Sequence, residues 1–313
     1  MQPLRLLPEY REYIWGGKRL RPTHPIQTAE AWVVYEKNKI LEGPYQGQTL
    51  SQASDALKVD LLGRRVMERT GLRFPLLIKL LDCAEWLSLQ VHPDDQQAQR
   101  LEGGGFFGKT EAWHILDAKE GAQLIGGVRE GIEAEELRQA IRDGSVIDLV
   151  QFIHVVKGDT ILMLPGTLHA IGPGLLLYEV QQTSDITYRV YDWKRPQTPE
   201  RRLQIEESLV VADPRKVSKA TALPEVKDGT HSMLCQSDYF QLHYLISRHR
   251  PAQLDTGGES FHALTGIQGQ GVVVLNEQVY PLNLYESLII PACCGAYEVT
   301  AKNDDFRVLL AHG

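Results

Sequence analysis

The sequence contains little cysteine. Its 313 residues include four cysteines, at positions 83, 235, 293 and 294, with no regular spacing. Proteins stapled by disulfides carry a denser framework of cysteines, and two adjacent cysteines are poorly placed to bond to each other. We therefore expect a reduced, intracellular protein that works in the cytoplasm.

Positive charge is also scarce. The chain has 33 lysine and arginine residues against 40 aspartate and glutamate residues, a formal net charge of −7. A general nucleic-acid-binding protein needs a basic face for the phosphates, so no nucleic-acid partner is expected. Hydrophobic residues make up 43% of the chain and charged residues 23%, which is typical of a globular protein and argues against disorder.

Long apolar runs are missing. The most apolar segment, residues 74–91, is interrupted by Lys79, Asp82 and Glu85, whereas a spanning helix needs ~20 predominantly apolar residues. The N-terminal segment carries arginine and glutamate where a signal peptide would be apolar. We expect neither a membrane partner nor secretion.

What the sequence does contain is a strand pattern. Short segments of Val, Ile, Leu and Tyr are separated by Gly, Pro and Asp, as in PLLIKLLD, EAWHILDA, DTILMLPG and LLLYEVQ, a spacing typical of a β-sandwich or barrel. Helical patterns occur near residues 50–59, 95–101 and 133–142, the first opened by a capping box at Thr49 and Gln52. The sequence predicts a mostly β protein with a small helical element near residues 50–71 or 133–149.

A weak internal repeat indicates two related β-lobes. Residues 159–169 align with residues 285–295, each a strand running into a proline turn. His169 of the first lobe aligns with Gly295 of the second, where only His262 stands near the start of a strand. If His169 binds a metal, only the first lobe can do so, and we expect the second lobe to act as a scaffold.

The boundary between the lobes is expected in the polar, proline-containing stretch 214–228. This divides the chain into an N-terminal catalytic domain with helical additions, residues 1–215, and a C-terminal domain without a metal site, residues 220–313.

Four residues are candidate metal ligands. On a strand, residues two apart point to the same side, so Gln90 and His92 would project together while their apolar neighbours pack behind. Glu111 and His169 follow later in the chain, His169 at the end of a proline turn. Two imidazoles, a carboxylate and an amide oxygen suit Zn²⁺ or a similar divalent ion, although each residue alone is also an ordinary polar group at a strand end.

The stretches YIWGG, LSLQVHPDD, GKTEAWHIL and PGTLHAIGPGLLLYEVQQTSDITYRVYDW occur in this order. Together they resemble the type I phosphomannose isomerases, the mannose-6-phosphate isomerases of the cupin superfamily. The run from Pro165 to Trp193 is the most specific part. The resemblance implies two cupin-like β-barrel or jelly-roll lobes, and the chain is similar to the short bacterial form because it lacks room for the helical insertion of longer members.

The resemblance also implies roles for individual residues. The family's zinc ligands fall on Gln90, His92, Glu111 and His169, with one Zn²⁺ per chain. The active-site arginine falls on Arg189, and the matching lysines, acid and serine are Lys79, Lys109, Asp185 and Ser88. Arg189, Lys109 and Asp185 are then the expected catalytic residues, while Lys79 and Ser88 would bind the substrate phosphate.

The implied reaction interconverts mannose 6-phosphate and fructose 6-phosphate, the expected partners, through an enediolate. An acidic protein that holds a doubly charged phosphate needs local positive charge, which Lys79, Lys109 and Arg189 would supply. A bound Zn²⁺ with Lys109 or Arg189 would stabilise the developing oxyanion. Asp185 and Lys109 are both candidates for the proton carrier.

The segment DITYRVYDW alternates apolar and polar residues, which predicts a strand. Arg189 and Thr187 would share one face of it, and Asp185 would extend the same polar row.

Two other functions are open. His92, Glu111 and His169 are also a set of two histidines and one carboxylate, which can bind Fe(II) for dioxygenase chemistry on a cupin fold. Gln90 as a fourth ligand and the phosphate-suited cations argue against that function. A non-catalytic sugar-phosphate-binding cupin is the other alternative, although a pure binder has little need of the metal.

Overall fold

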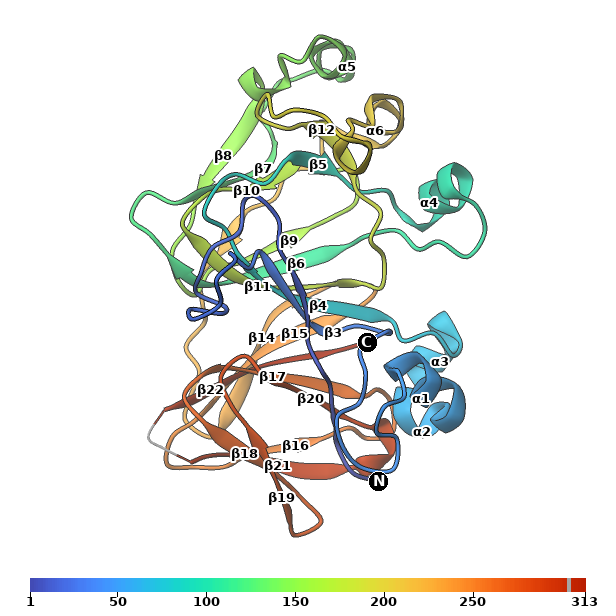
Figure 1. Ribbon diagram of the computed structural model, residues 1–313, viewed down its shortest axis with the longest axis vertical. Coiled ribbons are helices and arrows are strands. Elements are labelled where there is room, and N and C mark those ends of the chain that lie inside the picture. Colours follow the sequence, from blue (N-terminus) through green and yellow to red (C-terminus); the bar gives the residue numbers. More distant parts are fainter. Residues whose placement is uncertain (303–304) are drawn as a thin grey trace. The chain divides into compact units, whose positions relative to one another are not determined.

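Strands dominate the computed structural model, which describes residues 1–302 and 305–313 (Figure 1). The chain divides into two units. The C-terminal unit comprises Met1–Glu9, Ala31–Lys79 and Leu223–Gly313, and the central unit comprises Tyr10–Glu30 and Leu80–Ala222. The predicted mostly β fold is confirmed.

The central unit is built from antiparallel strands. One sheet has the strand order β12-β5-β10-β7-β8, and in the other β13, β9, β6 and β11 are neighbours in that order. Its strands are β5 (Leu89–Val91), β6 (Glu111–Ala118), β7 (Gln123–Val128), β8 (Val150–His154), β9 (Thr160–Met163), β10 (His169–Ile171), β11 (Leu175–Gln182), β12 (Tyr188–Tyr191) and β13 (Ala220–Thr221). Its helices are α4 (Asp95–Glu102), α5 (Ala134–Asp143) and α6 (Ile205–Val211), with short 3₁₀ turns at Val146–Asp148 and Pro199–Arg201.

Alternation along β5 decides which side chains face the interior of the central unit. Leu89 and Val91 belong to a core cluster shared with apolar residues of α5, α6 and β12. Because neighbouring strand residues point to opposite faces, Gln90 points away from this helix-covered side. A second cluster, which includes Trp113, fills the space on the other face.

The C-terminal unit contains a six-stranded sheet in the order β1-β20-β17-β22-β15-β14 and a four-stranded sheet in the order β16-β21-β18-β19. Its strands are β1 (Leu4–Arg5), β14 (Thr230–Gln236), β15 (Gln241–Ser247), β16 (Ala252–Asp255), β17 (His262–Gln268), β18 (Gly271–Leu275), β19 (Gln278–Leu282), β20 (Ser287–Ile290), β21 (Ala296–Ala301) and β22 (Phe306–His312). Helices α1 (Leu50–Leu57), α2 (Val59–Leu62) and α3 (Arg64–Thr70) and a 3₁₀ turn at Ala292–Cys294 complete it. An apolar cluster forms the core between the two sheets.

Three further strands each contain a point where the chain passes from one unit to the other. They are β2 (Glu9–Arg11), β3 (Glu30–Val34) and β4 (Leu76–Asp82).

The predicted helices are confirmed. Helix α1 begins after Thr49, whose hydroxyl accepts from the Gln52 amide at 3.2 Å while the Gln52 side chain accepts from the Thr49 amide at 2.9 Å. Helices α4 and α5 lie where the pattern placed them. Helix α6 was not predicted, and no side chain caps its start, unlike the starts of α1 and α4.

The aligned segments of the internal repeat adopt the same local structure. Strand β9 is followed by Pro165 and then by β10, and β20 is followed by Pro291 and then by β21. The change of unit between Ala222 and Leu223 falls inside the stretch where a boundary was expected, but residues 31–79 group with the C-terminal segment. The division into independent domains at residues 215–220 stays a prediction.

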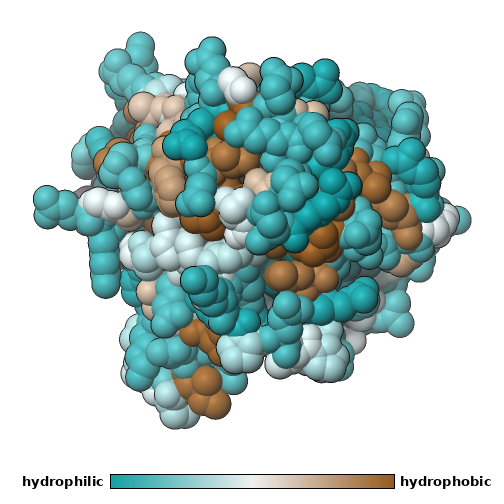
Figure 2. Space-filling view, turned by 90° about the horizontal axis from the view of Figure 1, so that it is seen from above, coloured by the Kyte–Doolittle hydropathy of each residue, from teal (hydrophilic) through white to brown (hydrophobic). Residues whose placement is uncertain are grey.

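Among the described residues, no helix is both long and apolar enough to cross a membrane. On the face shown in Figure 2, hydrophilic side chains cover most of the surface and hydrophobic ones lie in small patches between them.

Candidate active site

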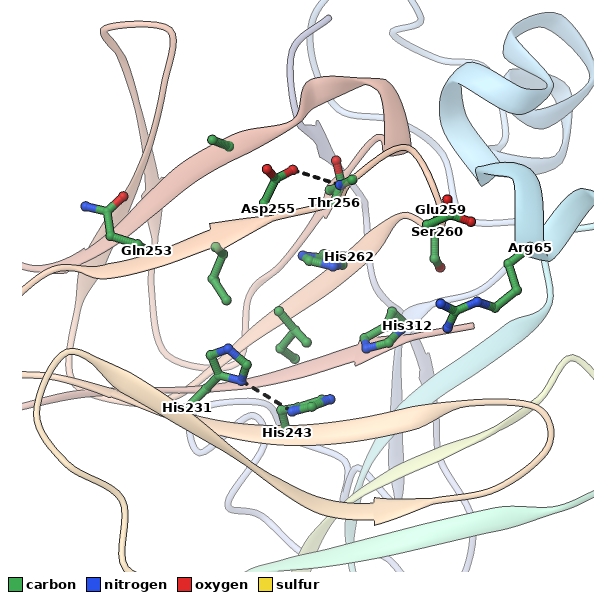
Figure 3. A pocket seen from close by; sticks show the side chains of 14 residues that line it. Arg65, His231, His243, Gln253, Asp255, Thr256, Glu259, Ser260, His262 and His312 are labelled. Atoms are coloured by element: carbon green, nitrogen blue, oxygen red, sulfur yellow. Dashed lines mark hydrogen bonds between the residues drawn. The ribbon is translucent and has the colours of Figure 1, made fainter.

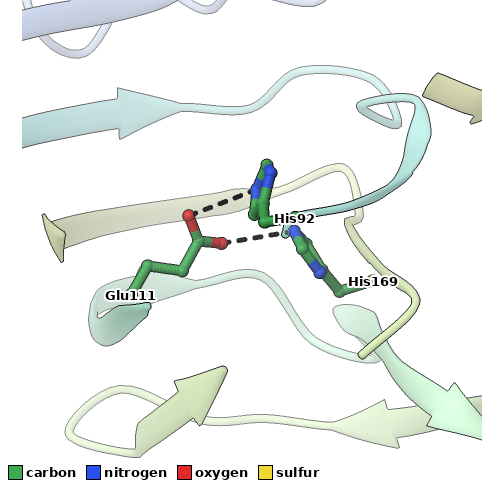
Figure 4. A group of neighbouring side chains, drawn as sticks. All are labelled: His92, Glu111 and His169. Carbon is green, nitrogen blue, oxygen red and sulfur yellow. Dashed lines mark ion pairs between the residues drawn. The ribbon is translucent and has the colours of Figure 1, made fainter. Parts of the chain in front are cut away.

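Three predicted ligands come together in the central unit (Figure 4). The carboxylate of Glu111, at the start of β6, places Oε1 3.3 Å from His169 Nε2 and Oε2 3.5 Å from His92 Nε2. All three residues are at most 2% exposed. Among the described residues, this is the only group of three or more histidine, cysteine, aspartate or glutamate side chains whose ligand atoms lie within 4.8 Å of one another.

The proline turn brings the two histidines together. The amide of Gly166 donates a hydrogen bond of 2.9 Å to the carbonyl of His92, which ties the residue after β5 to the turn that precedes β10. Gly166 has a φ of +86°, a left-handed conformation that favours glycine. In the sheet His169 of β10 pairs with Gln90 of β5, so these two predicted ligands lie on neighbouring strands.

The protonation of His169 suits a metal ligand. Its Nδ1 lies 2.8 Å from the carbonyl oxygen of Thr167, so Nδ1–H donates and the lone pair of Nε2 faces Glu111. Burial lowers the pKa of His169 to about 4, so at neutral pH no proton separates that lone pair from the carboxylate. A neutral imidazole nitrogen and a carboxylate oxygen that lie 3.3 Å apart in a buried site favour a cation between them, and the donor set fits a divalent metal ion.

Gln90 lies between His169 on β10 and Arg189 on β12. Arg189 Nε donates to Ser88 Oγ at 3.2 Å, and its Nη1 donates to the carbonyl of Arg202 at 3.1 Å. The predicted strand is confirmed, with Tyr188 and Val190 buried and Arg189 partly exposed on the opposite face. The sheet thus carries Arg189, Gln90 and His169 on three adjacent strands.

Lys109 lies beside the carboxylate. Its Nζ is 2.9 Å from Glu111 Oε2, and the residue is 4% exposed. Gly108, the residue before Lys109, passes close to the backbone at the start of α4. A Cβ on Gly108 would lie 2.4 Å from the carbonyl carbon of Asp94. Glycine is therefore required where this loop approaches α4.

The loop that carries Lys109 is fixed by two side chains that the sequence patterns did not single out for this role. Asp95 Oδ1 accepts from the amide of Gly108 at 2.7 Å and from Gln182 Nε2 at 3.0 Å, and Gln182 Oε1 accepts from the amide of Thr110 at 2.8 Å. In the sequence Asp95 looks like part of a helix start, and it is Asp94 that caps α4. Only the folded chain brings Gln182 to Asp95.

We expect Gln182→Ala to lower kcat by roughly 10–100-fold, the size typical of losing a partner that orients an active-site group. The change leaves the buried Thr110 amide without its acceptor and loosens Lys109, while His92, Glu111 and His169 stay in place. Steady-state kinetics with metal analysis tests this. Gln123→Ala, which removes an amide paired with the exposed His154, is the control, and equal activity of both variants would contradict the positioning role.

Two further predicted residues make none of the contacts described above. Asp185 is exposed between β11 and β12 and takes no part in the contacts described above. Lys79 is buried in the C-terminal unit, with its Nζ 5.2 Å from the centroid of the Trp32 ring. The phosphate-binding role of Lys79 stays a prediction.

Burial makes the metal-free protein sensitive to acid. It lowers the pKa values of His114 and His169 to about 4 from an ordinary 6.5, so between these pH values the unfolded chain binds protons that the folded chain does not. Stability should therefore fall as the pH drops from about 6.5 to about 4, by up to about 1.4 kcal/mol per pH unit for each histidine. Urea unfolding of chelator-treated protein measures this, and a flat profile over that range would contradict it.

The chain is similar to known proteins over nearly its whole length. Residues 4–105 match the family model of the phosphomannose isomerase type I catalytic domain. The chain is 34% identical to the mannose-6-phosphate isomerase of Streptococcus mutans, over 99% of this chain and 98% of that protein. It is 35% identical to the probable mannose-6-phosphate isomerase GmuF of Bacillus subtilis, over 95% and 96% of the two chains. The solved structure of a Bacillus subtilis mannose 6-phosphate isomerase matches with a TM-score of 0.87 and 31% identity, covering all of both chains.

Proposed function

The chain belongs to the type I phosphomannose isomerases and is a mannose-6-phosphate isomerase, and we propose that it works with one Zn²⁺ held by Gln90, His92, Glu111 and His169. We further propose that Arg189, Lys109 and Asp185 act on the sugar, and that the protein works in the cytoplasm, where phosphorylated sugars are metabolised. Family membership disfavours the dioxygenase and sensor alternatives.

The observation that carries the metal proposal is the buried carboxylate of Glu111 between two imidazole Nε2 atoms at 3.3 and 3.5 Å. Neutral imidazole and carboxylate ligands suit Zn²⁺, which prefers four ligands of this kind. Gln90 supports a fourth position because it is paired with His169 in the sheet. When bound, the ion would supply Lewis-acid stabilisation of negative charge on the sugar oxygens.

The reaction moves a proton from C2 of the open-chain aldose to C1 of the ketose, with an enediolate between them. Arg189 is held by Ser88 and the Arg202 carbonyl, so its guanidinium is already oriented to stabilise the negative charge that grows on the sugar oxygens. Lys109, an ammonium donor beside Glu111, suits the proton transfer that opens the sugar ring. Asp185 is proposed as the base on the family resemblance alone.

Lys79 and Ser88 are proposed to bind the substrate phosphate. If Lys79 holds the phosphate equally in the ground and transition states, Lys79→Ala should raise KM with kcat nearly unchanged. Steady-state kinetics over a wide range of mannose 6-phosphate concentration measures this. A fall in kcat without a change in KM would contradict the phosphate role.

The proposed function is tested by an isomerase assay with mannose 6-phosphate, with and without a chelator. We expect turnover to fructose 6-phosphate, loss of activity in the chelator and recovery with added Zn²⁺. Activity that persists in metal-free protein would overturn the metal proposal, and ligand binding without turnover would overturn the catalytic one.

A further inference from the structure

Four of the ten histidines of the chain line one cavity in the C-terminal unit (Figure 3). The cavity has a volume of about 560 Å³. The four histidines lie on adjacent strands of the six-stranded sheet and are His262 on β17, His312 on β22, His243 on β15 and His231 on β14. In the sequence they are scattered between positions 231 and 312, and only His262 stood out there.

The strand register arranges the four rings in one row. Met233 pairs with His243 and Gln241 pairs with His312, so His231 is a diagonal neighbour of His243, and His243 is a diagonal neighbour of His312. Ala263 pairs with Ala311, which places His262 directly opposite His312. Ring centroids are 5.1 Å apart for His231 and His243, 5.4 Å for His243 and His312, and 5.4 Å for His312 and His262.

One end of the row has the geometry of a metal-binding pair. His231 Nδ1 and His243 Nδ1 are 3.3 Å apart. Two imidazole nitrogens that bind one tetrahedral Zn²⁺ at 2.0–2.1 Å are about 3.4 Å apart. In the absence of a metal ion, the same distance allows a single N–H···N hydrogen bond.

The surroundings of His243 favour the metal-binding form. Its Nε2 lies 3.3 Å from Gln241 Oε1, so Nε2–H donates and the lone pair is on Nδ1, which faces His231. A side chain that fixes the distal N–H in this way is typical of metal-binding histidines. Burial and the neighbouring histidines lower the pKa of His243 to about 4, which keeps the ring neutral at physiological pH.

Charge around the cavity differs between the two ends of the row. Arg65 of α3 lies near His312 and opposes a cation there, as Figure 3 shows. His231 and His243 lie at the other end, on the far side of His312 from Arg65. The lining also contains two carboxylates, Asp255 and Glu259, and Arg65 is its one lysine or arginine. The end formed by His231 and His243, away from Arg65, is therefore the more favourable one for a cation.

We propose that His231 and His243 bind a second divalent transition-metal ion of the Zn²⁺, Ni²⁺ or Cu²⁺ class through their Nδ1 atoms, with water completing the coordination shell. Among the described residues only the group around Glu111 brings three ligand atoms within 4.8 Å, so the second ion binds more weakly than the first. The proposal does not rest on the isomerase function, because it uses other residues in the other unit.

The test is equilibrium dialysis of the whole protein against buffers of increasing free Zn²⁺, with metal content measured at each step. We expect one tight and one weaker ion in the wild-type chain. His231→Ala and His243→Ala should each weaken the second ion at least tenfold, and both should keep the first ion and isomerase activity. Glu111→Gln should lose the first ion and keep the second.

His249→Ala is the matched control, because His249 is an exposed imidazole in the turn after β15 that does not line the cavity. It should retain both ions. A wild-type chain that saturates with one ion, or a His231→Ala chain that binds two with wild-type affinities, would overturn the proposal. His231 is exposed, so its replacement keeps the test decisive even if His243→Ala fails to fold.

Discussion

Arg189→Ala is expected to lower kcat and kcat/KM together, by roughly 10²–10³-fold, the loss typical of removing one donor to a developing oxyanion. The guanidinium is fixed by Ser88 Oγ and the Arg202 carbonyl at 3.2 and 3.1 Å and stands next to Gln90 in the sheet. A pre-oriented charge of this kind acts mainly on the transition state. Steady-state kinetics in both reaction directions, with metal content measured, tests it.

Arg202→Ala is the matched control for this experiment. Arg202 is exposed and its backbone carbonyl accepts from Arg189, so truncating its side chain removes one positive charge and leaves the hydrogen bond intact. Its activity should be near that of the wild type. An Arg189→Ala protein with wild-type kcat/KM would refute the catalytic role, and a rise in KM alone would reassign Arg189 to ground-state phosphate binding.

His169→Ala is expected to abolish both tight metal binding and activity. It removes one of the two proposed nitrogen ligands and leaves a buried carboxylate with an incomplete set of partners, so metal affinity should fall by more than the roughly 10–100-fold typical of losing an outer partner. Elemental analysis after extensive dialysis should find about one ion per wild-type chain and far less in the variant.

The control is His154→Ala, which removes an exposed imidazole at the end of β8 in the same unit. It should keep metal and activity. Metal-free wild-type protein that remains fully active, or a His169→Ala chain that holds its ion as tightly as the wild type, would show that the group around Glu111 is not the catalytic metal site.

The sequence alone was enough to predict most of the fold and the grouping of His92, Glu111 and His169. Strand alternation predicted that the side chain of Gln90 points to the opposite face from its apolar neighbours. The internal repeat predicted that β9 and β20 each run into a proline turn. The capping box at Thr49 and Gln52 predicted where α1 begins. These features depend on the local chain, where alternation, turn chemistry and capping are set by residues a few positions apart.

The contacts between these segments depended on the tertiary structure. No local pattern shows that Gln182 meets Asp95, 87 positions away, to fix the loop of Lys109, or that Asp185 stays exposed while Lys109 reaches Glu111 at 2.9 Å. The histidine row is set in the same way, because the order β17-β22-β15-β14 places side by side strands that are far apart in the chain. Sheet pairing joins residues across long loops, so which polar groups share a site is decided only when the strands are assembled.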